Sequence, residues 1–146
     1  MDLTQSRPIV SAIIEKEENN TKYIYLQTRW KPKTSPDYSG LLEIPAGGIE
    51  GYEEVVSAIK REVKEETGLD IVKINGDYEE KLEENIKGNK VKIFKPFLCQ
   101  QMLSSTGGLP WIGFVFRCEV QGDVNINKDE AKDPLWLTID ELKKYF

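Results

Sequence analysis

The sequence predicts an α/β fold in which helices cover a mixed β-sheet. Three observations support this class: β-branched runs with two-residue alternation, one long stretch of helical periodicity, and a second helix start near the C-terminus. Their order is three strands, a helix, three strands and a terminal helix, which is typical of a mixed sheet packed against helices. The 146 residues, 39% of them hydrophobic, are enough for one domain spanning residues 1–146.

The first two strands are expected to form a hairpin. Residues 7–14 (RPIVSAII) are an apolar, β-branched run typical of a buried strand, and residues 23–29 (YIYLQTR) show two-residue alternation. A polar turn at residues 17–20 joins them. Two prolines mark residues 31–40 as a loop, and residues 41–45 (LLEIP) indicate a short third strand.

Residues 53–67 carry the longest helical pattern in the chain, and Gly68 is placed to end the helix. On a wheel of about 100° per residue, one stripe of this helix is apolar and is expected to pack on the sheet. The residues of this stripe are Val55, Val56, Ile59 and Val63.

The second half of the chain predicts further strands. Charged residues at 77–92 indicate an excursion such as a hairpin, and residues 91–99 and 111–120 are the strongest later strands. The last predicted elements are a short strand at 135–137, a capping box from Thr138 to Glu141, and a terminal helix ending at Phe146.

The composition excludes several kinds of active site. The chain has no histidine, so it has no Ser-His-Asp or Cys-His pair, no imidazole base and no His-ligated zinc. Its two cysteines, Cys99 and Cys118, cannot complete a structural zinc site and are expected to be small core residues. Catalysis must therefore depend on carboxylates with a metal, on a lysine, or on a lone thiolate.

The sequence also predicts a cytoplasmic protein. The N-terminal MDLTQSRPIV lacks the basic and apolar regions of a signal peptide. No apolar run approaches the roughly 18 residues of a membrane span, so no membrane partner is expected. The net charge of -5 argues against a nucleic acid polymer as a partner, because such binders usually carry a basic face.

Three glutamates of the central helix share one face. Glu62 precedes Glu65 and Glu66 by three and four residues, and each like-charge pair at that spacing costs roughly 0.2–0.5 kcal/mol. Only Arg61 offers nearby compensation. A divalent cation would remove the repulsion, because carboxylate oxygens are the hard ligands that Mg²⁺ and Mn²⁺ prefer.

These glutamates belong to a longer motif with the spacing G-x5-E-x7-R-E-U-x-E-E-x-G-U, where U is aliphatic. The motif runs from Gly47 to Leu69 and is matched at every position. It is the Nudix box, so the chain resembles the Nudix hydrolases, which cleave nucleoside diphosphates linked to another moiety. The strand order and the segment EIPAGGIE extend the resemblance over most of the chain. The resemblance implies an α/β/α sandwich with a mixed sheet.

The resemblance implies a metal site built on the box. Glu62 and Glu66 are expected to be the main Mg²⁺ ligands, with Mn²⁺ as another usable metal. Glu65 is expected close by, and the backbone carbonyl of Gly47 is expected to complete the site. Arg61 is expected to orient one of the glutamates. The glycine pair at residues 47–48 is expected to permit a tight loop that points carbonyls at the metal.

Other expected site residues flank the box or lie beyond it. Glu53 is expected to brace the start of the helix by pairing with arginine. Many relatives use one more carboxylate from a loop near the C-terminal helix, and Glu130, or else Asp129, occupies that neighbourhood. Glu119 is a further candidate for this carboxylate. Arg29 ends the second strand, where relatives often keep a basic residue that faces the substrate.

The sequence leaves the substrate open among nucleotide-type small molecules. Residues 43–47 (EIPAG) are similar to the E-x-P-A-G stretch of ADP-ribose and sugar-nucleotide pyrophosphatases. Residues 109–123 are instead similar to Nudix enzymes acting on oxidised guanine nucleotides. A non-catalytic Nudix-like nucleotide sensor is the alternative function, although such sensors usually have a degraded box. The Nudix-fold isomerase of isoprenoid diphosphates needs histidines and is excluded. The chain is expected to be a monomer or a small homo-oligomer.

Overall fold

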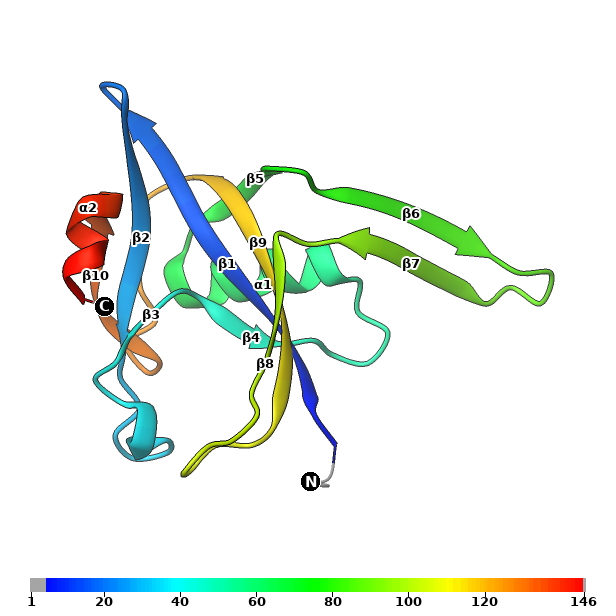
Figure 1. The fold of residues 1–146 in the computed structure, drawn as a ribbon, viewed down its shortest axis with the longest axis horizontal. Helices are drawn as coiled ribbons and strands as arrows, with labels where there is room; N and C mark the ends of the chain where they lie inside the picture. The colour runs from blue at the N-terminus through cyan, green and yellow to red at the C-terminus, as the bar shows by residue number, and fades with distance from the viewer. Residues whose placement is uncertain (1–4, 146) are drawn as a thin grey trace.

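The computed structural model describes residues 5–145 and has a mixed sheet centred on β1 (Arg7–Glu18). β1 runs parallel to β9 (Trp111–Gln121) from Arg7 to Ile14 and antiparallel to β2 (Thr21–Arg29) from Glu15 to Glu18. The sheet order is β10-β2-β1-β9-β5 (Figure 1). One parallel pair within an otherwise antiparallel sheet confirms the predicted mixed α/β fold.

The predicted N-terminal hairpin is present but longer than expected. Its turn is confined to Asn19 and Asn20, whose φ angles are 52° and 62°. Two positive φ values in a two-residue turn match the right-handed twist of the strands on either side. β1 therefore continues to Glu18 instead of ending before the polar residues.

The predicted strand at 41–45 is shorter than expected, and a second short strand with a different neighbour follows it. β3 (Leu42–Glu43) pairs with β2, whereas β4 (Ala46–Gly48) pairs with β1. The division occurs at Pro45, which lacks a backbone N–H for a continuous ladder. The preceding loop contains a short 3-10 helix, η1 (Pro36–Tyr38).

The central helix α1 spans Val55–Thr67 and packs on the sheet. It begins two residues later than predicted, because Glu54 has an extended conformation and its carboxylate caps the helix by accepting from the N–H groups of Val56 and Ser57. Gly68 ends the helix as predicted, with φ at 77°. The buried apolar residues of the helix are Val55, Ala58, Ile59 and Val63.

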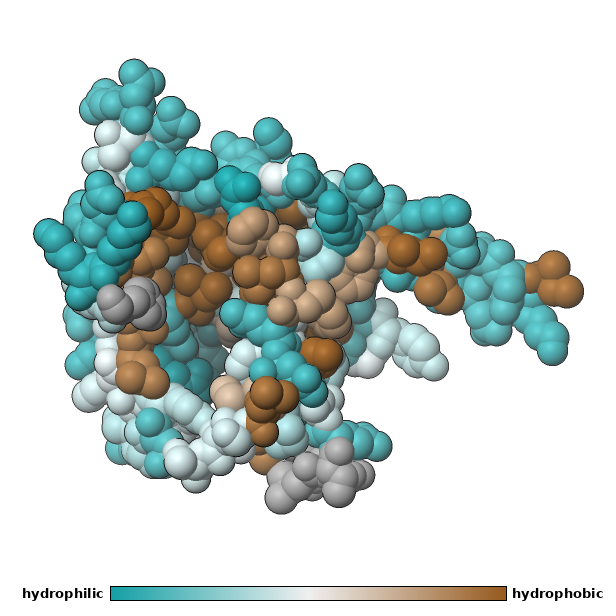
Figure 2. All heavy atoms as spheres, in the orientation of Figure 1, coloured by the Kyte–Doolittle hydropathy of each residue, from teal (hydrophilic) through white to brown (hydrophobic). Residues whose placement is uncertain are grey.

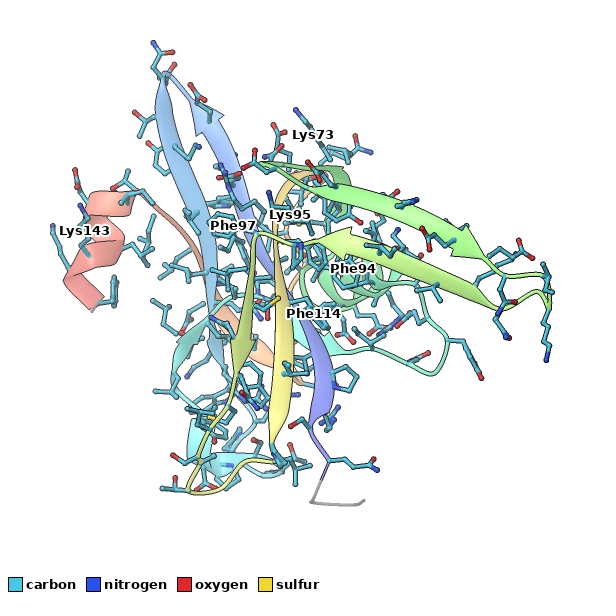
Figure 3. The ribbon with its side chains drawn as sticks, turned by 45° about the vertical axis from the view of Figure 1, so that its right-hand side comes forward. Lys73, Phe94, Lys95, Phe97, Phe114 and Lys143 are labelled. Carbon is cyan, nitrogen blue, oxygen red and sulfur yellow. The ribbon has the colours of Figure 1, made fainter. Side chains whose placement is uncertain are left out.

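The charged segment after β5 (Asp70–Ile74) forms the predicted hairpin, composed of β6 (Glu79–Glu84) and β7 (Lys90–Lys95). The hairpin projects from the body of the molecule (Figure 1). Its surface is mostly hydrophilic, with a few hydrophobic residues among the charged ones (Figure 2). At its base, Phe94 packs on Phe114 with 5.2 Å between ring centroids (Figure 3).

The prediction of one continuous strand at 91–99 is wrong, because these residues belong to two strands with different neighbours. β7 pairs with β6, whereas β8 (Leu98–Gln101) pairs with β9, and Pro96 lies between them. Cys118 is buried in the core as expected. Cys99 is exposed, contrary to expectation, because β8 lies at the edge of the sheet.

The last strand, β10 (Ala131–Leu137), is longer than predicted and contains a bulge between Lys132 and Leu135. Thr138 caps the short helix α2 (Ile139–Leu142), and a 3-10 turn, η2 (Lys143–Tyr145), follows it. The predicted helix end at Phe146 lies outside the described residues. None of the helices formed by residues 5–145 has the length and apolar character that crossing a membrane requires.

A buried polar cluster joins β1, β9 and the residue that follows β5. The side chain of Glu15, in a residue only 5% exposed, accepts hydrogen bonds from Asn75 at 3.0 Å and from Arg117 at 3.0 and 3.2 Å. Burial alone would raise the pKa of Glu15, but the bonds from Asn75 and Arg117 outweigh burial and lower the pKa overall. The ionised carboxylate is therefore the form that the fold stabilises.

We predict that Glu15→Gln lowers the free energy of unfolding by about 1–3 kcal/mol at pH 7. Because the pKa of Glu15 is lower in the folded state, its stabilisation is present above the ordinary carboxyl value of 4.5 and is lost as pH falls below it. Urea unfolding at several pH values should show the difference from wild type shrinking in acid. Glu17→Gln, on the exposed part of β1, is the control. Equal stability of Glu15→Gln and wild type at pH 7 would contradict the prediction.

Candidate active site

The site begins where α1 crosses β4, with the side chain of Glu62 against the backbone of Gly47. A Cβ atom placed on Gly47 would lie 2.0 Å from the carboxyl carbon of Glu62. Gly47 belongs to β4 and pairs with Val10 of β1, and it has no positive φ. The expectation of a tight glycine loop is therefore wrong at this position. Glycine is required because the carboxylate approaches the backbone closely.

Glu66 lies one turn further along α1 and is only 7% exposed. Its carboxylate accepts a hydrogen bond from the N–H of Ala46 at 3.1 Å. Burial raises the pKa of Glu66 to about 8, and the negative charges of Glu130, Glu43 and Glu62 also raise it. The site is thus a buried carboxylate surrounded by like charges, which is an arrangement that favours binding of a cation.

Arg61 holds the rim of this cluster through four partners. Its guanidinium donates to Glu53 at 2.8 and 2.9 Å and to Glu62 at 2.7 Å. It also donates to the carbonyl of Gly48 at 2.9 Å and to Glu65 at 3.3 Å. The bond from Arg61 lowers the pKa of Glu53 to about 2. The box residues are therefore tied to one arginine, which also connects α1 to β4.

The two remaining box glutamates differ in their surroundings. Burial raises the pKa of Glu62, although the bond from Arg61 opposes this effect. Glu65 is more than half exposed, and among the described residues its one ion pair is with Arg61. Glu62 and Glu66 thus form the buried part of the cluster, and Glu65 lies at its exposed margin.

The loop before β10 brings Glu130 to the cluster. The N–H of Asn127 bonds to the carbonyl of Glu66 at 2.9 Å, and the N–H of Asn125 bonds to that of Thr67 at 2.7 Å. These bonds fix the loop against the end of α1. The charge of Glu130 then raises the pKa of Glu66, and Lys31 lies 3.8 Å from the carboxylate of Glu130.

The other carboxylates considered from the sequence lie elsewhere. Asp129 is exposed, and its backbone N–H bonds to the side chain of Asn127. Glu119 lies on β9, opposite Lys73 of β5, and forms an ion pair with that lysine at 3.8 Å. Of the three candidates, Glu130 is the one whose charge raises the pKa of Glu62 and Glu66.

A row of polar residues on β2 adjoins the cluster, and sequence reasoning missed most of it. The hydroxyl of Tyr25 donates to Gln27 at 3.2 Å, and Gln27 donates to Glu43 at 3.4 Å. Arg29 forms an ion pair with Glu43 at 3.7 Å. Residues 25, 27 and 29 are spaced two apart on one strand, so they share a face. The signal available in the sequence was Gln27, which lies two residues after Tyr25 and therefore on the same face of the strand.

Arg29 and Glu43 form an ion pair, but one polar atom of Arg29 lacks a hydrogen-bond partner among the described residues. Burial raises the pKa of Glu43, and the charge of Arg29 opposes this effect. One terminal nitrogen of Arg29 donates to Ser35 at 3.3 Å. Its Nε atom is buried and has no hydrogen-bond partner among the described residues. A buried donor without a partner is costly, so a ligand oxygen bound there would be stabilising.

The donor set fits a hard divalent cation. Glu62 and Glu66 supply the more buried oxygens, and Glu130, whose side chain is a third exposed, adds its charge beside them. A carboxylate surrounded by like charges gains most from a cation. Within residues 5–145, no three such side chains already surround a single point at metal-binding distances. Arg61 holds Glu62 directly, so this side chain would have to turn toward a metal ion.

Comparison with known proteins identifies the family and the fold. The family model described as NUDIX domain matches residues 5–146. A search of curated proteins found no match. The fold is similar to a MutT NUDIX hydrolase from Burkholderia pseudomallei, with a TM-score of 0.68, 20% identity, and coverage of 94% of this chain and 86% of that one.

Two further solved structures have the same fold at lower identity. The NUDIX domain of Shewanella oneidensis NrtR, in complex with ADP ribose, has a TM-score of 0.61 and 12% identity over 96% of this chain and 77% of that one. The C. elegans Ap4A hydrolase has a TM-score of 0.58 and 15% identity, with coverage of 97% and 86%. These likenesses concern the fold, whereas the family match spans almost the whole sequence. The resemblance identified from the box is confirmed, and the chain belongs to the NUDIX domain family.

Proposed function

We propose that the chain is a Mg²⁺-dependent hydrolase of nucleoside diphosphates linked to another moiety. The observation that carries the proposal is the buried carboxylate of Glu66, surrounded by the charges of Glu130, Glu43 and Glu62. A diphosphate is itself anionic and would be repelled by this cluster. A divalent cation is the simplest group that could hold the carboxylates and the substrate together.

The residues that would hold the metal are Glu62 and Glu66, with Glu65 and Glu130 beside them. When bound there, Mg²⁺ would neutralise phosphate oxygens and lower the pKa of a bound water. Arg61 would keep Glu62 and Glu53 in place through its fixed set of donors. Attack of water on phosphorus would release a nucleoside monophosphate and a second phosphorylated product.

Two residues outside the box have proposed roles in this reaction. Glu130 comes from a different element than the helix glutamates, and its ion pair among the described residues is with Lys31 and not with Arg61. In the proposed reaction it accepts a proton from the attacking water. Arg29 has a buried Nε donor without a hydrogen-bond partner in the described part of the chain. An oxygen of the substrate, on a phosphate or on the base, would satisfy this donor.

Two substrate classes remain candidates. The first is ADP-ribose or a sugar nucleotide, which is supported by the structure of the NUDIX domain of NrtR, a protein of similar fold complexed with ADP ribose. The second is a normal or oxidised nucleoside di- or triphosphate. Dinucleoside polyphosphates belong in the same comparison, because a structure of similar fold is named as an Ap4A hydrolase.

A panel of substrates tests the function. ADP-ribose, sugar nucleotides, dinucleoside polyphosphates, NADH, and normal and oxidised dNTPs would each be incubated with the protein and Mg²⁺ or Mn²⁺. We expect release of a nucleoside monophosphate from at least one class, and none in the presence of EDTA. Tight binding of one compound without hydrolysis of any would instead support the alternative function, a nucleotide sensor.

We predict that Glu62→Gln and Glu66→Gln each lower kcat by at least about 100-fold, because an amide is a poor replacement for a carboxylate metal ligand. The fold should persist, since glutamine has nearly the same shape. The rise in Tm that Mg²⁺ produces in wild type should be lost in both variants. Glu84→Gln, on the exposed hairpin, is the matched control and should behave as wild type. Near-normal turnover by either site variant in saturating Mg²⁺ would refute the assignment.

We also predict that Gly47→Ala impairs the site while the chain still folds. The new methyl would lie 2.0 Å from the carboxyl carbon of Glu62, so that side chain must move. We expect at least a tenfold loss of turnover, in the range found when groups that support metal ligands are changed, and a smaller Mg²⁺-induced rise in Tm. Gly51→Ala is the matched control, because its Cβ would meet no atom within 4 Å. Equal behaviour of the two alanine variants would show that the close approach of Glu62 is unimportant.

A further inference from the structure

The strand β8 has a free edge. It pairs with β9 on one side and with no other strand among residues 5–145. The N–H of Met102 bonds to the carbonyl of Trp111 at 3.0 Å. In an antiparallel pair the hydrogen-bonded positions alternate, so the backbone groups of Cys99 and Gln101 point away from β9. These groups form an unpaired row at the edge of the sheet.

The sequence around β8 is unusually free of charge. Residues 96–116 contain no Asp, Glu, Lys or Arg, although 31% of the chain is charged. Phe97 is 53% exposed and Leu103 is 86% exposed, and Leu98 and Ile112 are also exposed. In Figure 2, hydrophobic residues lie on the front face in the region of β8, interrupted by hydrophilic ones. An exposed apolar patch along a free strand edge is a feature of association surfaces.

The longer edge strands of the described residues are protected in ways that β8 is not. β6 carries four glutamates, β7 carries three lysines, and β5 carries Asp70 and Lys73. β10 contains Pro134 and a bulge. Charges, prolines and bulges are the usual means of preventing strand addition at an edge. β8, with the sequence LCQQ, has none of these within the strand.

We propose that two copies of this chain associate through antiparallel pairing of β8 with β8 about a two-fold axis at Gln100. In this register, Cys99 of one copy faces Gln101 of the other, and each such pair exchanges two backbone hydrogen bonds. The flanking apolar residues also match, because Phe97 meets Leu103 and Leu98 meets Met102. Both the hydrogen bonds and the apolar contacts are therefore self-complementary.

Charge identifies a second copy of this chain as the occupant of the edge. Symmetric pairing of β8 brings no like charges together, because the segment is neutral. The same pairing at β6 would place glutamates against glutamates, and at β7 it would place lysines against lysines. Directly opposed like charges destabilise a strand pair. Of these three edges, β8 is the one that can pair with itself without repulsion.

Sedimentation velocity over a range of protein concentrations tests the proposal. Wild type should reach twice the chain mass of 16.7 kDa as concentration rises. Gln101→Pro removes an N–H that points to the free edge and spares the ladder with β9, and we expect at least a tenfold weaker dimer from the two bonds lost. Gln100→Lys places two like charges at the axis and serves as a second variant if the proline variant fails to fold. Thr106→Lys adds the same charge to an exposed loop and should leave the dimer unchanged.

Disulfide trapping tests the register. In a Cys99→Ser background, Gln100→Cys would place two thiols on the axis at a non-hydrogen-bonded pair, where Cα atoms are about 4.5 Å apart and a disulfide can form. We expect rapid cross-linking under mild oxidation, and no comparable cross-linking of Thr106→Cys in the same background. A wild-type mass of 16.7 kDa at every concentration would overturn the proposal. A dimer that survives both β8 variants, or equal cross-linking at the two positions, would also overturn it.

Discussion

The site depends on one unfavourable interaction, the burial of the Glu66 carboxylate among other negative charges. Burial and the charges of Glu130, Glu43 and Glu62 all raise the pKa of Glu66. Leaving a buried charge without a partner is costly, so other contacts must hold these residues in place. Arg61 ties Glu62 and Glu53 to the backbone of β4. The fold thus maintains a site of high negative charge density that a cation and an anionic substrate could share.

Helix α1 contacts the elements that surround that carboxylate and fixes their positions. At its start, Glu54 caps the helix and also pairs with Lys92, which links the helix to the projecting hairpin. At its end, Gly68 has a positive φ, and an added Cβ there would lie 3.1 Å from the side chain of Asn125. Glycine therefore permits both the helix end and the close approach of the loop that carries Glu130. One helix connects the hairpin, β4 and the C-terminal loop.

Local patterns predicted those parts of the site that depend on residues close together in the sequence. The helical wheel places the glutamates beside the apolar stripe, and Gly68 marks the end of the helix. The contact between Gln27 and Glu43 could not be predicted in this way, because it depends on the pairing of β2 with β3. The position of Glu130 likewise depends on a backbone bond between Asn127 and Glu66, residues distant in sequence. The exposure of Cys99 follows from the edge position of β8, which the composition of the strand does not reveal.

Charge is distributed unevenly along this chain, and its effect differs between α1, the β6-β7 hairpin and β8. In α1, like charges are concentrated at one point, where a bound cation would relieve their repulsion. In the hairpin, Glu79 lies opposite Lys95 and Glu84 lies opposite Lys90, so unlike charges stabilise a two-stranded element that has little core of its own. The next strand, β8, is neutral and is therefore able to pair with an identical strand. Because the acidic and basic strands of the hairpin each repel their own copies, the same distribution that stabilises the hairpin directs self-association to β8.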